Sequence, residues 1–533
     1  FPTRRSSDLQ MTALSGDQLS KMTTEQLAEL STEQIGAIRI TELPSLSEEQ
    51  IASFDPATQM SGFSTAQIKA LSDTQVKALT ALQVKALSSS QISAIETDDL
   101  KAMSEEQIQA LTTGADSSIN QIQALTTTQF QALTVAQIAA MTDTQVADIE
   151  NKDLASLSGE QLNAMTATQV AALTGAQTKA LTTAQIPELG AEFLNAMTTT
   201  QLQALTAAQV KSLTVDQVPL VDEAHVAMFT PDQIKVLSLD QMKVFTDGQF
   251  GALGTVTDPD TGTFDQIGAI TTTNINGLGS TILGKLTDAQ VTALTSAQIK
   301  SLSTTDLPSL DATWITAIGT DTTALSSTQL GVLTAEQVGA IDITNLLPGQ
   351  ISKLGYEAHD AVAATDTTPA IPAMLNQIGA LTETQLGAIS ADQIKVLTTA
   401  QLGALTVTQI PQISATALPS MTAAQIGAFS ETQVAALDAD TQITVLTAAQ
   451  IYGLKEAGIN GLTTGQIGAL AATQTTSANA GEGLKAAQLK TMTDEQLGAF
   501  GDEVVAALTA AQVTGLSAAQ VTALGWVAPT TTA

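Results

Sequence analysis

An eight-residue phrase repeated along almost the whole chain most constrains what it can fold into. The stretch STAQIKALSDTQVKALTALQVKAL, from Ser64 to Leu87, holds three copies of [ST]-x-x-Q-[IVL]-x-A-[LMIF], whose positions we number 1 to 8. Between Gln121 and Gln249, seventeen successive position-4 sites follow one another without insertion or deletion. We call each copy an octad. A unit this short cannot hold its own core, so the octads are expected to form an array that shares one.

Positions 1 and 4 together make a pattern that starts helices. A Ser or Thr followed three residues later by Gln is a capping box, in which each side chain bonds to the other residue's backbone N–H. Position 8 of one octad and position 5 of the next have the spacing of a hydrophobic staple. Around Ser72 these residues are Leu71, Ser72, Gln75 and Val76. The pattern predicts one helix start in every octad.

Two other repeat architectures fit the pattern less well. In one continuous helix, eight residues advance by about 800°, so the apolar stripe would rotate by about 80° per octad. Keeping that stripe on one face would need about 4 residues per turn, beyond the ~3.67 of right-handed supercoils. A β-solenoid needs alternation with period two, which positions 5, 7 and 8 lack. The sequence therefore predicts an all-α fold, an α-solenoid or superhelix of very short helices, one per eight-residue repeat.

Gln at position 4 is expected to serve the backbone and not a ligand. Where this Gln is replaced, at Asp99 and Asp153, the hydroxyl cap is replaced too, by Glu96 and Glu150. This coupling predicts that the Gln amides lie near the backbone of their own cap or of a neighbouring octad. A helix of about six residues is unstable alone. Stability is therefore expected to come from nearest-neighbour contacts, with the small Ala at position 7 letting adjacent backbones approach closely.

The register of the repeat divides the chain. Residues 1–9, FPTRRSSDL, fit no octad and match the translation of the sequencing adapter TTC CCT ACA CGA CGC TCT TCC GAT CT, so we interpret them as an artefact on an environmental gene fragment. We predict an octad solenoid over 10–253, a solenoid with loop insertions over 254–376, a second octad solenoid over 377–524, and a tail or truncation over 525–533. Surface loops or kinks are expected at five register slips: Thr113–Asn120, Gly254–Asp265, Gly319–Ser326, Pro348–Asn376 and Thr475–Lys485.

Variant octads that lack Gln at position 4 begin at Arg39, Glu96 and Glu150. They lie 57 and 54 residues apart, a spacing that suggests the length of a superhelical turn. Later variant octads do not keep this spacing.

Composition excludes several classes of partner and site. The formal net charge is −32 and the Lys residues are scattered, which argues against nucleic acid and anionic membrane as partners. No apolar run reaches the ~18 residues of a membrane helix, so no membrane span is expected in this fragment. The chain has no Cys, which excludes disulfides, thiolate metal sites and Cys nucleophiles.

Few residues are candidates for chemistry. The nucleophile-elbow, HExxH and P-loop motifs are all missing, so we predict no enzyme, no catalytic residue and no cofactor-binding residue. The two histidines, His225 and His359, are isolated and are expected to be structural. Three methionines occupy position 8 and are expected in the core rather than as haem ligands: Met103, Met141 and Met165.

One acidic stretch is a weak candidate for Ca²⁺. TDPDTGTFD places Asp258, Asp260 and Asp265 around Gly262, and Ca²⁺ prefers oxygen ligands of this kind. The stretch lacks the spacing of an EF-hand. The same residues also suit an ordinary turn, so the metal remains undecided from the sequence.

The phrases LTTAQI and LTAAQV resemble octapeptide-repeat arrays of large bacterial surface or secreted proteins of the adhesin type. More distantly, the array is similar to mesothelin-type superhelical repeats, whose short helices also begin with L-[ST]-x-x-Q/E. The resemblance implies an extracellular or cell-surface, structural or adhesive region that acts as a spacer or display surface. It implies other proteins or cell-surface ligands as partners, and it carries over no binding residue. The alternative is an intracellular α-solenoid scaffold for protein–protein binding.

Overall fold

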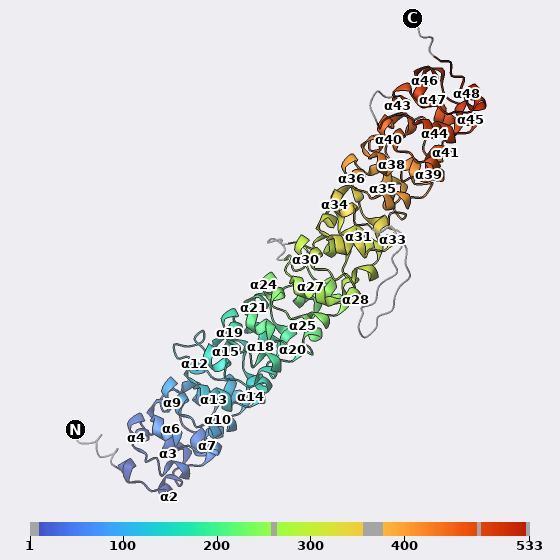
Figure 1. The fold of residues 1–533 in the computed structure, drawn as a ribbon. Helices are drawn as coiled ribbons and strands as arrows, with labels where there is room; N and C mark the ends of the chain where they lie inside the picture. The colour runs from blue at the N-terminus through green and yellow to red at the C-terminus, as the bar shows by residue number, and fades with distance from the viewer. Residues whose placement is uncertain (1–9, 257–263, 355–376, 477–480, 529–533) are drawn as a thin grey trace, which may run out of the picture. The chain divides into compact units, whose positions relative to one another are not determined.

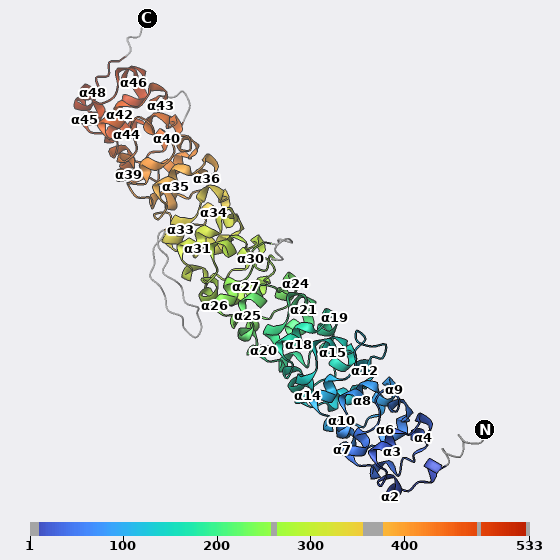
Figure 2. The ribbon, with the colours of Figure 1, turned by 180° about the vertical axis from the view of Figure 1, so that it is seen from behind.

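The computed structural model describes residues 10–256, 264–354, 377–476 and 481–528, and it divides the chain into two compact units. Unit 1 is Phe1–Ile270 and unit 2 is Thr271–Ala533. Within the described ranges every regular element is a short α-helix or 3₁₀ helix, and none is a strand (Figures 1 and 2). The all-α prediction is confirmed.

The helices of unit 1 are α2 Gly16–Leu19, α3 Thr24–Ala28, α4 Thr32–Ala37, η1 Leu43–Ser45, α5 Glu48–Ala52, η2 Met60–Gly62, α6 Thr65–Lys69, α7 Asp73–Ala78, α8 Ala81–Ala86, α9 Ser89–Ala94, α10 Thr97–Ala102, α11 Glu105–Gln109, α12 Gln121–Ala124, α13 Thr127–Ala132, α14 Val135–Ala140, α15 Asp143–Asp148, α16 Asn151–Leu154, α17 Gly159–Asn163, α18 Ala167–Ala172, α19 Gly175–Ala180, η3 Ile186–Glu188, α20 Ala191–Ala196, α21 Thr199–Ala204, α22 Ala207–Lys211, η4 Val218–Leu220, α23 Glu223–Val226, α24 Pro231–Lys235, α25 Leu239–Lys243 and α26 Asp247–Gly251.

The helices of unit 2 are α27 Thr272–Leu278, α28 Ser280–Leu283, α29 Asp288–Thr292, α30 Ser296–Ser301, η5 Leu307–Ser309, α31 Ala312–Ala317, η6 Gly319–Ala324, α32 Ser327–Gly331, α33 Ala335–Ala340, η7 Ile343–Asn345, α34 Pro348–Ile351, α35 Glu383–Ala388, α36 Ala391–Lys395, α37 Thr399–Gly403, η8 Ile410–Gln412, η9 Leu418–Ser420, α38 Ala423–Ile426, α39 Glu431–Ala435, η10 Ile443–Val445, α40 Ala448–Gly453, α41 Glu456–Asn460, α42 Thr464–Gly468, α43 Ala472–Thr475, α44 Ala486–Thr491, α45 Asp494–Leu497, α46 Asp502–Ala507, α47 Ala510–Val513 and α48 Ala518–Leu524.

Helix starts have the predicted capping-box geometry. Before α7, the Ser72 hydroxyl accepts from the Gln75 N–H at 3.3 Å, and Gln75 Oε1 accepts from the Ser72 N–H at 3.1 Å. The same reciprocal pair precedes α14 and α18, at Thr134 and Thr166. These bonds satisfy backbone donors that the first turn of a helix leaves free, which is why such short helices begin reliably at position 1.

The core consists of positions 5 and 8. Val76 and Leu79, at positions 5 and 8 of one octad, are 0% and 5% exposed. Met103, Met141 and Met165 are also buried, as predicted for position 8. Two buried side chains per octad from every helix give each unit a continuous apolar axis, so no single helix has to be stable alone.

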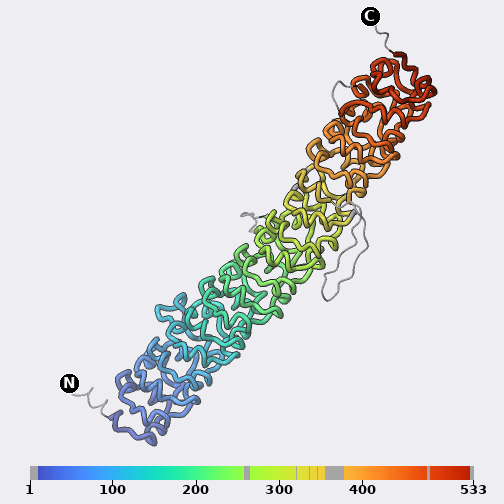
Figure 3. The backbone as a smooth tube through the Cα atoms, in the orientation of Figure 1, coloured from blue at the N-terminus to red at the C-terminus, as the bar shows by residue number. Residues whose placement is uncertain are grey.

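Each helix packs mainly against the helix three octads further along the chain. In unit 1, α6 contacts α9, α7 contacts α10, and α11 contacts α14. The backbone of this unit accordingly winds as a coil of stacked turns (Figure 3). The expectation that adjacent octads are the main neighbours was therefore wrong, because a six-residue helix followed by a sharp bend turns away from the next one. The 57- and 54-residue spacings do not measure one turn either.

A hydroxyl at position 6 can bond directly to a stacked turn. The Ser93 hydroxyl donates to the Ala124 carbonyl at 2.6 Å, and in unit 2 the Thr292 hydroxyl donates to the Ala317 carbonyl at 2.9 Å. Both acceptors are position-7 residues of the octad three further on. Position 7 thus contributes its backbone carbonyl to the contact between turns.

Proline at position 6 changes the helix type without breaking the array. In η3, Pro187 is the second residue of a 3₁₀ helix, and the Glu188 N–H at position 7 donates to the Gln185 carbonyl at 2.9 Å. Proline removes the position-6 N–H but leaves that at position 7 free to close a tighter turn. The sequence reasoning did not foresee this. The six prolines at this position are Pro44, Pro187, Pro219, Pro308, Pro411 and Pro419.

Two predicted loops prove to be helical. The slip at Gly319–Ser326 is filled by the six-residue helix η6, which begins two residues after the end of α31. The seven residues 319–325 therefore take the place of an octad before the next cap at Ser326. The slip predicted from Pro348 begins later, because α34 continues the array to Ile351 with Pro348 at its first position, where proline costs no hydrogen bond. Residues 355–376 lie outside the described ranges.

Candidate functional site

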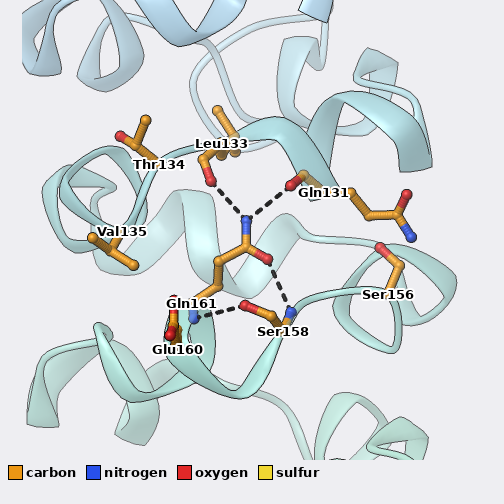
Figure 4. Close-up of a pocket in the computed structure, with 8 residues that line it drawn as sticks. All are labelled: Gln131, Leu133, Thr134, Val135, Ser156, Ser158, Glu160 and Gln161. Atoms are coloured by element: carbon orange, nitrogen blue, oxygen red, sulfur yellow. Dashed lines mark hydrogen bonds between the residues drawn. The ribbon is translucent and has the colours of Figure 1, made fainter.

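The position-4 side chain lies in a slot between two stacked turns, and Gln161 shows its geometry (Figure 4). Its Nε2 donates to the carbonyls of Leu133 at 2.7 Å and Phe130 at 3.1 Å, with a longer approach to Gln131 at 3.4 Å. Its Oε1 accepts from the Ser158 N–H at 2.9 Å. Leu133 and Phe130 are positions 8 and 5 of the octad four copies earlier. One carboxamide therefore caps its own helix and bonds to an earlier turn.

The same bonds recur in both units. Gln75 donates to the carbonyls of Leu43 at 2.9 Å and Leu46 at 2.8 Å, and Gln450 in unit 2 donates to those of Leu418 and Met421 at 2.9 and 2.8 Å. Gln137 and Gln169 behave alike. The predicted role is confirmed and extended, since these amides bond to both their own cap and another octad.

Two insertions leave the slot intact. Before α12, Gln121 lies nine residues after Thr112, and its Oε1 still accepts from the Thr112 N–H at 2.9 Å. Gln266 accepts in the same way from the Gly254 N–H at 2.9 Å, across twelve residues. In both octads the extra residues enter between positions 1 and 4 of the sequence.

Other donors replace Gln at some slots. His225 Nε2 lies 3.0 Å from the Met197 carbonyl, and Trp314 Nε1 donates to the Leu283 carbonyl at 2.9 Å. Each ring offers one N–H where Gln offers two. His225 is thus structural, as predicted. Trp314 was not singled out from the sequence, although its place at position 4 was the available signal.

Asp153 fills a slot without supplying a donor. It is fully buried, and the Thr127 hydroxyl of α13 donates to its Oδ1 at 2.5 Å while Oδ2 has no hydrogen-bond partner. Burial raises the pKa of this carboxyl, and the bond from Thr127 partly opposes that rise. The octad also lacks a side-chain cap at Glu150, which agrees with the coupling seen in the sequence.

Asp99 fills the equivalent slot in the octad that begins at Glu96. It is 7% exposed and makes no hydrogen bond through its carboxylate. Burial, followed by repulsion from Glu96, Asp73 and Asp98, raises its pKa to about 6. Both buried carboxyls thus favour the neutral form more than an exposed Asp does.

An open surface groove of about 460 Å³ lies beside the slot of Gln161. Its lining residues are Gln131, Leu133, Thr134, Val135, Ser156, Ser158, Glu160 and Gln161. Thr134, Ser158 and Gln161 already take part in helix caps, and Glu160 is the one acid among the lining residues. A similar groove of about 420 Å³ lies at equivalent octad positions around Glu96 and Gln129. Because the two grooves lie at equivalent octad positions, they follow from the stacking of the turns.

The calcium candidate is only partly described. Asp258 and Asp260 lie outside the described residues, as does His359. Asp265 is described, and its Oδ1 accepts from the Gly268 N–H at 2.7 Å in a turn. Among the described residues, no three acidic or histidine side chains are grouped so as to hold a metal ion. Likewise, none of the described helices has the length and apolar character needed to cross a membrane.

Comparison with known proteins identifies the repeat type. The family model of the ALTTAQ repeat matches residues 51–89 and 146–183, both within unit 1. The matched segments include ordinary octads such as Ser72–Leu79 and Thr166–Leu173. No curated protein matches the chain.

Proposed function

We propose that this chain is a non-enzymatic structural or adhesive region of a bacterial surface or secreted protein, lying outside the cell, where its solenoid acts as a spacer or display surface. The observation that carries the proposal is which positions of the octad keep the same type of residue along the chain. Positions 1, 4, 5 and 8 repeat, and all four are used for caps, cross-turn bonds and core. Positions 2, 3 and 6 vary and are mostly exposed.

This division supports a spacer over an array of identical binding sites. A repeated ligand site requires repeated exposed chemistry, whereas here exposed positions differ from octad to octad. Lys69, Lys77 and Lys85 are exposed at position 6, but the equivalent residues in α14 and α18 are Ala139 and Ala171. Selection for stacking explains the repetition without a ligand.

A display assay tests the proposal. The full chain is placed between a bacterial outer-membrane anchor and an epitope, and antibody access to the epitope is measured on cells that carry surface polysaccharide. A spacer predicts reduced access when the four octads 64–95 are deleted. It predicts unchanged access when Lys69, Lys77 and Lys85 are all replaced by Ser.

The opposite pattern would contradict the spacer role. In that pattern the deletion leaves antibody access to the epitope unchanged, and the triple Lys→Ser variant no longer binds a specific protein that the native chain captures. A binding scaffold would then be the better description.

A further inference from the structure

We propose that Asp99 and Asp153 form two pH-sensitive joints within unit 1, at which stacked turns hold more tightly when the carboxyl is protonated. The inference starts from the slot that each Asp occupies. Gln91 donates to the carbonyls of Met60 and Phe63, and Gln107 donates to those of Val76 and Leu79.

Asp99 stands midway between these two glutamines in sequence. By the same register its slot faces the carbonyls of Ile68 and Leu71, which are positions 5 and 8 of the octad four copies earlier. For Asp153, the matching acceptors are the carbonyls of Ile122 and Leu125. An ionised carboxylate has no N–H or O–H to give, so neither pair of carbonyls receives the bonds that Gln supplies elsewhere.

Protonation of the carboxylate supplies the donor that these carbonyls lack. A proton from solvent adds to one carboxylate oxygen, giving a neutral group with one O–H donor and no buried charge. The buried Asp153 Oδ2, which lacks a partner, is the atom best placed to carry it. The neutral side chain removes the repulsion between a buried anion and the carbonyl oxygens and supplies one bond across the turns.

The charges that act most strongly on Asp99 favour its protonation. Glu96 and Asp98 on its own octad and Asp73 on α7, which packs against α10, raise the pKa of Asp99. The cations of the same two helices are Lys101, which pairs with Asp98 at 3.1 Å, and Lys77. α13, the other partner of α10, carries no titratable side chain.

Around Asp153 the two nearby charges shift the pKa of the carboxyl in opposite directions. Glu150 favours protonation and Lys152 opposes it, both from the same octad. The packed helix α13 contributes the Thr127 hydroxyl, and Lys179 is the charged residue of α19, the other packed helix.

The direction of the pH effect follows from linkage. A carboxyl with a raised folded-state pKa destabilises the fold when ionised, so the penalty is absent below the unfolded value of 3.8 and complete above about 6. Acidification from pH 7.5 to pH 5.0 therefore stabilises the Asp99 joint by about tenfold in its opening equilibrium.

Hydrogen exchange of the full chain, corrected for the intrinsic rate at each pH, tests this at both joints. We expect protection of residues 64–71 and 96–103 to rise about tenfold from pH 7.5 to pH 5.0. In Asp99→Gln that rise should vanish, with protection high at both values. Asp153→Gln should do the same for residues 118–125 and 150–157. Gln restores the common octad, so both variants are expected to fold.

Asp143→Gln, at an exposed position 2 of α15, is the matched control and should leave both joints pH-dependent. The proposal fails if Asp99→Gln and Asp153→Gln keep the native pH dependence. It also fails if protection at pH 7.5 rises with added NaCl or CaCl₂ and not with acid, because the slots would then hold a cation.

Discussion

At the scale of a residue, the position-4 side chain needs one acceptor and two donors directed to opposite sides. The Gln carboxamide provides both, with Oε1 on its own helix cap and Nε2 on two carbonyls of an earlier turn. The atoms are buried, so an unmet bond is not replaced by water. This requirement explains why Gln recurs at position 4 while Ser and Thr alternate freely at position 1.

Gln137→Leu keeps the side-chain volume but removes these bonds. The carbonyls of Leu100 and Met103 lose their donor, and each buried unsatisfied group costs about 1–3 kcal/mol. We expect a loss of about 3 kcal/mol in local stability, measured by hydrogen exchange of residues 97–103 and 134–141.

Gln131→Leu is the control for that change, since Gln131 is an exposed residue at position 6. It should alter stability by no more than ~0.5 kcal/mol. Equal losses in the two variants would show that the carboxamide has no special role at position 4.

His225 offers a second test of the donor requirement. His225→Gln supplies two N–H groups where the ring supplies one, and it removes the buried Nδ1 that has no partner. We expect a higher thermal midpoint for this variant. His225→Leu should lower the midpoint, because it leaves the Met197 carbonyl without its donor at a cost of about 1–3 kcal/mol. A His225→Leu protein as stable as the native one would contradict the interpretation.

At the scale of an element, each helix is short because its end is fixed by the next cap. The chain bends at position 8, where Leu79 has φ −60° and ψ 132°, and the next octad begins with its own capping box. The helix type between these points is less constrained. The octad of Pro187 keeps its Thr182–Gln185 cap and its buried Ile186 and Leu189 while replacing the α-helix by a 3₁₀ turn.

A pair of proline variants in α14 tests this tolerance. Ala139→Pro, at position 6, should convert the helix to a 3₁₀ turn at a small cost in stability. Ala140→Pro, at position 7, removes the N–H that closes that turn and should cost about 3 kcal/mol or more. Thermal unfolding followed by circular dichroism compares the two. The reverse order of stability would contradict the proposed use of the position-7 N–H.

At the scale of the whole molecule, the interactions have a fixed range along the sequence. Helices pack on the helix three octads away and Gln bonds reach the octad four away, so octads in the interior of a unit have similar environments. Removing whole octads leaves these relations in place for the octads that remain. Removing part of an octad leaves a segment without a cap or a cross-turn donor.

Two deletions in unit 1 separate these cases. Deleting residues 64–95 joins Phe63 to Glu96 in register, and Gln107 should take over the carbonyls of Leu43 and Leu46 that now accept from Gln75. We expect helicity per residue and the thermal midpoint to stay close to native values. Deleting 64–91 joins Phe63 to Ile92, which lacks positions 1–4, and should lower both. Circular dichroism measures the two quantities, and equal losses would refute the range of interaction deduced above.

The sequence by itself determined what happens within an octad. The cap, the buried positions and the backbone role of Gln75, Gln137 and Gln169 were all predictable, because they depend on contacts between residues three or four apart. Only the tertiary structure decided which octads meet. The pairing of Gln161 with Leu133 and the donor role of Trp314 depend on how sharply each position 8 bends. Small differences in that bend accumulate over successive octads, so the number of octads per turn follows from the packing of the whole array and not from any local pattern.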